Sequence, residues 1–91
     1  MSSKRQKENE EKLVKAISTL QTVADSTITP RNIRKVVKDA ILMLNDTKLS
    51  LGVRVANAIS MLDEISQDPN MPSFSRVNIW SALSILESIR D

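Results

Sequence analysis

The sequence predicts an all-α protein: an up-and-down four-helix bundle built from two similar helical hairpins. Its 91 residues include one Gly and three Pro, too few for the many turns of an all-β domain. Apolar residues recur at steps of three and four along four segments that short polar connectors separate. A shift of 42 residues also aligns the first half of the chain with the second, which indicates two copies of one hairpin.

The first predicted helix covers about residues 8–24. Its apolar residues lie on one face and its lysines and hydroxyl residues on the other, so we expect an amphipathic helix. Residues 1–7 precede it and include Lys4, Arg5 and Lys7, which predicts a mobile basic tail. The residues expected in the core are Leu13, Ala16, Ile17, Leu20, Val23 and Ala24.

The second predicted helix covers about residues 30–45. Thr29 offers a hydroxyl that suits an N-cap, and Pro30 fits the first helical position, where its missing N–H has no cost. The residues expected in the core are Ile33, Val36, Val37, Ala40, Ile41 and Leu44.

The third and fourth helices are predicted at about residues 51–67 and 72–90. Ser50 is expected to cap the third helix. Pro69 prevents that helix from continuing, whereas Pro72 suits the first turn of the next one. The residues expected in the core are Leu51, Val55, Ala58, Ile59, Leu62 and Ile65 from the third helix, and Ile79, Ala82, Leu83, Leu86 and Ile89 from the fourth.

The chain is predicted to form a single domain over residues 8–91, with hairpin repeats at about 12–48 and 54–90. The 42-residue shift places the run Ala-Ile-Ser-Thr-Leu on Ala-Ile-Ser-Met-Leu, and it places Pro30 on Pro72 without a gap. Chance similarity between two amphipathic hairpins is the alternative. Because two units are too few for an open solenoid, we expect the hairpins to close on each other.

The composition argues against most enzyme classes. The chain contains no Cys and no His, which removes disulfides, thiolate metal sites and the commonest general base. We therefore expect no catalytic residues, no cofactor, no metal ligands and no enzymatic activity. No apolar run is long enough to span a membrane and none follows the basic N-terminus, so a cytoplasmic protein without membrane contact is predicted.

A basic stripe is predicted on the second helix. Arg31, Arg34, Lys35 and Lys38 follow at three- and four-residue steps opposite the apolar face. One interpretation is a solvated face, on which Lys35 pairs with Asp39. The other is a nucleic-acid contact through phosphates, although neither stacking aromatic residues nor a phosphate-binding loop accompanies it.

Trp80 and Val77 lie away from the predicted core face of the fourth helix. The 42-residue shift aligns them with Lys38 and Lys35, so two outward basic positions of the first hairpin become apolar in the second. One interpretation is a protein interface, with a second copy or another partner, since aromatic residues are enriched at interface centres. In the other, the Trp80 ring folds over the edge of the bundle.

Carboxylates gather near the end of the third helix, at Asp63, Glu64 and Asp68, with Asn70 beside them. A hard cation is one interpretation, but the Gly turn and the distal Glu of a calcium loop are absent. Turn formation by Asp68 and Asn70 is the other interpretation, and the one we favour.

Residues 55–72 read VANAISMLDEISQDPNMP and are followed by Asn-Ile-Trp at 78–80. This run resembles the archaeal uncharacterised protein family 0147. The resemblance implies a short cytoplasmic archaeal protein with an up-and-down four-helix fold, and it implies no activity. From the residues themselves we expect a non-enzymatic module for protein interaction or self-association through Trp80, with nucleic-acid association through the second helix as the alternative.

Overall fold

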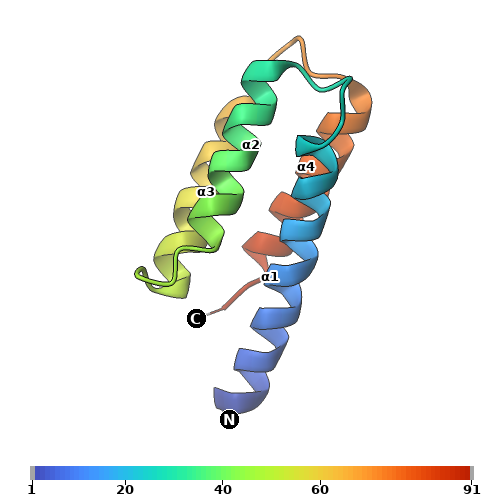
Figure 1. Ribbon diagram of the computed structural model, residues 1–91. Coiled ribbons are helices and arrows are strands. Elements are labelled where there is room, and N and C mark those ends of the chain that lie inside the picture. Colours follow the sequence, from blue (N-terminus) through green and yellow to red (C-terminus); the bar gives the residue numbers. More distant parts are fainter. Residues whose placement is uncertain (1, 91) are drawn as a thin grey trace.

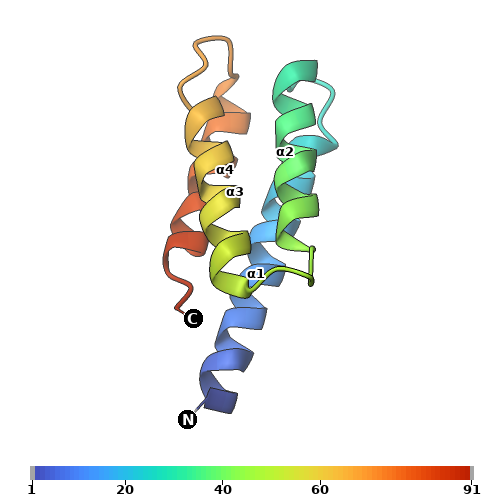
Figure 2. The same cartoon turned by 90° about the vertical axis from the view of Figure 1, so that its left-hand side faces the viewer.

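The computed structural model describes residues 2–90 and confirms the all-α prediction (Figure 1). In this part of the chain the helices are α1 (Ser2–Ala24), α2 (Arg31–Leu44), α3 (Leu51–Ile65) and α4 (Ser73–Glu87). Consecutive helices run in opposite directions along an elongated bundle of 43 × 21 × 20 Å (Figures 1 and 2).

The closest helix pairs join the two predicted hairpins to each other. Figure 1 shows α1 beside α4 and α2 beside α3, and these two pairs share the most extensive contacts. Within the hairpins, α1 also packs against α2, whereas α3 and α4 contact each other least. The bundle is therefore held together mainly across the hairpins.

An aliphatic core lies between the helices, as the sequence predicts. All four helices contribute fully buried side chains, and many positions aligned by the 42-residue shift are both fully buried. The identical pairs among them are Ala16 and Ala58, Leu20 and Leu62, Ala40 and Ala82, and Leu44 and Leu86. This agreement favours the internal repeat, which stays an interpretation.

Helix α1 begins at Ser2, six residues before the predicted start. Residues 2–7 thus continue the helix, and their end extends beyond the other helices (Figure 1). The physical reason is local: Lys, Arg, Gln and Glu favour helix, and Lys4 and Lys7 precede Glu8 and Glu11 by four residues. Met1 lies outside the described residues, and the mobility of this segment stays a prediction.

The start of α2 differs from the prediction. The helix begins at Arg31, with Pro30 as its N-cap and without a side-chain cap, so the predicted capping role of Thr29 is wrong. The Thr29 hydroxyl instead lies in the interior, where its Oγ1 is 2.8 Å from the Oγ of Ser75 on α4. The predicted cap of α3 is confirmed, because the Ser50 side chain accepts a hydrogen bond from the backbone N–H of Val53.

The C-terminal ends of α3 and α4 fall two and three residues before their predicted positions. After α4, the carbonyl of Ser88 accepts a hydrogen bond from Lys12 Nζ at 2.9 Å. The carbonyl of Arg90 accepts one from Asn9 Nδ2 at 2.5 Å. Side chains of α1 thus donate hydrogen bonds to backbone carbonyls that follow α4. None of the helices within residues 2–90 has the length and apolarity needed to cross a bilayer.

Candidate protein-association surface

The outer face of α4 exposes three large apolar side chains. Phe74, Val77 and Trp80 are 40%, 61% and 54% exposed. Their spacing of three residues places them along one side of the helix, away from the buried Ile79 and Leu83. The structure therefore puts Val77 and Trp80 on the solvent side of α4, where the sequence predicts them, and adds Phe74.

The same face carries no charge over three helical turns. Every exposed residue of α4 between positions 73 and 84 is uncharged: Ser73, Phe74, Val77, Trp80, Ser81 and Ser84. We call these six residues the α4 face. Sequence reasoning found two of them, because it searched for apolar residues off the core stripe and did not ask which positions lack charge. The regular spacing of Phe74 and the serines is the signal that would have identified the rest.

Arg76 holds one edge of the α4 face in place. Its Nη1 donates to the carbonyl oxygen of Ser66 at 2.7 Å, and its Nη2 donates to that of Asp68 at 3.2 Å. The guanidinium carbon also lies 5.9 Å from the centroid of the Trp80 ring, a cation–π distance. The guanidinium thus lies beside the Trp80 ring, and about half of the Trp80 surface remains exposed.

The basic stripe on α2 is less uniform than the sequence suggests. Arg31, Lys35 and Lys38 are exposed, and Lys35 Nζ forms the predicted ion pair with Asp39 Oδ2 at 3.2 Å. Arg34 is half-buried, and its Nε is buried without a hydrogen-bond partner. One of the four cations is thus paired and another is partly withdrawn from solvent. Nucleic-acid contact at this face stays a prediction.

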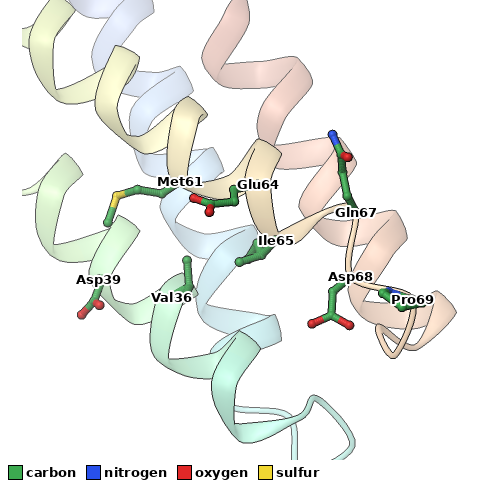
Figure 3. A pocket seen from close by; sticks show the side chains of 8 residues that line it. All are labelled: Val36, Asp39, Met61, Glu64, Ile65, Gln67, Asp68 and Pro69. Carbon is green, nitrogen blue, oxygen red and sulfur yellow. The ribbon is translucent and has the colours of Figure 1, made fainter.

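A groove of about 610 Å³ lies between α2 and α3, near the connector to α4 (Figure 3). Its apolar lining comes from Val36, Met61, Ile65 and Pro69, and Asp39, Glu64, Gln67 and Asp68 form its polar part. In Figure 3, Val36 of α2 and Ile65 of α3 point into the space between the helices, whereas Gln67 points away from it.

Asp68, one of the carboxylates that line this groove, stabilises the local turn. Asp68 Oδ1 accepts a hydrogen bond from the Asn70 N–H at 2.8 Å, which confirms the predicted turn role of Asp68. Its Oδ2 accepts another from Asn32 Nδ2 at 3.3 Å, and this bond links the connector to α2. Among the described residues, no three acidic side chains converge in a way that could hold a metal ion.

Comparison with known proteins identifies relatives over nearly the whole chain. Residues 1–89 match the model of a family described as an uncharacterised protein family, UPF0147. A UPF0147 protein of Metallosphaera sedula is 57% identical over 92% of this chain and 94% of its own length. One of Aeropyrum pernix is 50% identical over 92% of each chain.

Two crystal structures share the fold. The unknown function protein MMP1188 aligns with a TM-score of 0.86 at 41% identity, over 90% of this chain and 93% of its own. A protein from UPF0147 of Thermoplasma acidophilum aligns with a TM-score of 0.87 at 30% identity, over 92% of this chain and 99% of its own. Neither the relatives nor the structures carry an assigned activity.

Proposed function

We propose that this chain, which belongs to the uncharacterised protein family UPF0147, is a cytoplasmic, non-enzymatic module that associates with protein through the α4 face. The observation that carries the proposal is the exposure of Phe74, Val77 and Trp80 on a helix face without charge. Burial of large apolar side chains against a partner is favourable by about 25 cal/mol per Å² of apolar surface removed from water.

The α4 face has the composition of an interface centre. Such centres are depleted of charged residues and enriched in aromatic ones, and Trp is among the residues whose truncation most weakens binding.

Two other exposed apolar residues, Val14 and Leu42, have charged neighbours. Val14 on α1 is 67% exposed, but its exposed neighbours include Glu10, Glu11 and Lys15. Leu42 on α2 follows Lys38 by one helical turn. Single apolar residues of this kind are normal on protein surfaces and need no partner.

The experiment compares two Val→Lys variants that differ in position and little in exposure. The tagged wild-type chain, Val77→Lys and Val14→Lys are used to capture proteins from an archaeal extract, and each captured protein is then mixed with the purified chain. We expect at least one protein to bind the wild type and Val14→Lys directly and to bind Val77→Lys at least tenfold more weakly. If all three chains bind the same proteins equally, the α4 face is not an association surface.

A third variant tests the alternative at α2. Charge reversal through Arg31→Glu and Lys38→Glu removes two exposed cations that are remote from the α4 face in sequence. Under the proposal this variant retains protein association. Loss of association here, with Val77→Lys unaffected, would move the functional surface to α2.

A further inference from the structure

We infer that the groove between α2 and α3 binds a basic amphipathic helix of a partner protein. The inference is independent of the α4 face, because it concerns other residues and a partner of different chemistry. It follows from three features of the groove: its apolar lining, the carboxylates beside that lining, and the charges of the side chains around it.

The apolar part of the groove comes from both helices and from the connector that follows α3. Val36 of α2 and Ile65 of α3 point into the space between the helices (Figure 3), and Met61 and Pro69 complete this part of the lining. Val36, Met61 and Ile65 are half-buried, so part of each side chain stays accessible. An apolar groove of this kind accepts the apolar face of a helix, and the flexible Met side chain adapts to the shape of its partner.

The charged part of the groove is acidic. Asp39, Glu64 and Asp68 line it, and no Lys or Arg is among the described residues that do so. Asp68 accepts its hydrogen bonds from a backbone N–H and a side-chain amide, which are neutral donors and leave its negative charge uncompensated. The Glu64 side chain is exposed and forms neither a hydrogen bond nor an ion pair with another described residue. The groove therefore combines negative charge with apolar surface.

The neighbouring cations do not cancel this charge. Lys35 pairs with Asp39, but the two side chains are 76% and 42% exposed, and an exposed pair is weak enough for the cation of a partner to compete. Arg31, Arg34 and Lys38 share another side of α2, because steps of three and four residues place them together, and none of them lines the groove. Three carboxylates and one nearby cation leave the groove with a net negative charge.

A basic amphipathic helix complements both parts of the lining. Its apolar face contacts the apolar residues, while Lys or Arg side chains on its flanks reach the carboxylates. An acidic helix would place like charges opposite each other, and a nucleic acid would do so through its phosphates. A wholly apolar partner would remove carboxylates from water without supplying a counter-charge. Charge complementarity thus selects the basic helix.

Binding of synthetic peptides to the purified chain tests the inference. The probe is a labelled peptide of about four helical turns, with Leu at steps of three and four residues and Lys at the other positions, kept at trace concentration. Two reference peptides replace every Lys with Glu, or every Leu with Ser. By fluorescence anisotropy, we expect the wild-type chain to bind the Leu–Lys peptide at least tenfold more tightly than either reference peptide.

Two neighbouring carboxylates of α3 supply a matched pair of variants. Glu64 lines the groove and Asp63 does not, yet both are exposed, and substitution by Lys changes the net charge equally. We expect Glu64→Lys to weaken binding of the Leu–Lys peptide at least tenfold, and Asp63→Lys to weaken it less than twofold. Met61→Gln retains the length of the side chain and removes its apolar character, so it should also weaken binding. Val77→Lys, on the α4 face, should bind as the wild type does.

Three results would overturn the inference. The first is no binding of the Leu–Lys peptide up to about 1 mM of the wild-type chain. The second is an equal loss in Glu64→Lys and Asp63→Lys, which would mean that net charge alone attracts the peptide. The third is equal affinity for the peptide in which Ser replaces Leu, which would mean that the apolar lining is not used. Circular dichroism of each variant confirms that the helices are intact.

Discussion

Thr29 and Ser75 form a polar contact in the interior of the bundle. Both side chains are fully buried, and their hydroxyl oxygens are 2.8 Å apart. The bond joins the connector between α1 and α2 to the first turn of α4. Buried hydroxyls need such a partner, because burial without one costs about 1–3 kcal/mol.

The Thr29→Val substitution retains the shape of the side chain and removes its hydroxyl. We expect the free energy of unfolding to fall by about 1–3 kcal/mol, because Ser75 then loses its partner. The Ser75→Ala variant should also be less stable, and the double variant should lose less than the sum of the two. Urea unfolding followed by circular dichroism measures all four proteins. Strict additivity would mean that the two hydroxyls contribute independently.

At the scale of helices, an arginine recurs at the fourth position of α2, α3 and α4. Arg54 on α3 donates from Nη1 to the carbonyl oxygen of Leu44 at 2.9 Å, at the end of α2. Arg76 on α4 similarly donates to Ser66, just after α3. These bonds satisfy carbonyls that the preceding helix leaves unpaired at its C-terminus. Arg34 occupies the corresponding place on α2, but its buried Nε has no partner.

Arg34 and Arg76, which the 42-residue shift aligns, are thus expected to differ in their contribution to stability. Arg76→Met removes two charge-assisted hydrogen bonds and should lower the free energy of unfolding by roughly 1.5–3 kcal/mol. Arg34→Met removes a buried donor that is already unpaired, so the change should stay below about 1 kcal/mol. Thermal and urea unfolding of both variants measure the difference. Equal losses would show that Arg34 also makes a stabilising contact.

At the scale of the whole molecule, the contact between α3 and α4 is the least extensive of the four helix contacts. An open groove of about 250 Å³ lies there, lined by Gly52, Val55, Ala56, Ile59, Leu86, Glu87 and Ile89. Small residues on α3 keep this space open. Gly52 also has a negative φ, which any residue can adopt.

The Gly52→Ala substitution should therefore stabilise the bundle. Gly52 lies beside an open groove, and Ala restricts the unfolded chain more than Gly does, so we expect the free energy of unfolding to rise by about 0.4–1 kcal/mol. Ala56→Gly, one helical turn away, is the reverse control and should lower it by up to about 1 kcal/mol. Urea unfolding measures both variants. A loss of stability in Gly52→Ala would mean that the α3 helix cannot accept a Cβ at this position.

Part of the proposed association surface can be predicted from the sequence, and part cannot. Trp80 and Val77 are identifiable because helical spacing excludes them from the core stripe of α4. Phe74, Ser81 and Ser84 become meaningful only once the helix boundaries and the exposed side of α4 are known. The position of Arg76 beside Trp80 depends on carbonyls of the preceding connector, so it could not be inferred from spacing.

The spacing of residues along the chain predicts the helices, the aliphatic core, the Ser50 cap and the Lys35–Asp39 pair. Each of these depends on residues within one or two helical turns, where the spacing of apolar and polar side chains sets the outcome. Three features could not be predicted in this way: the hydrogen bond between Thr29 and Ser75, the hydrogen bond from Asn9 to the Arg90 carbonyl, and the close pairing of α1 with α4. These contacts join residues that are far apart along the chain, and their geometry exists only after the four helices have packed.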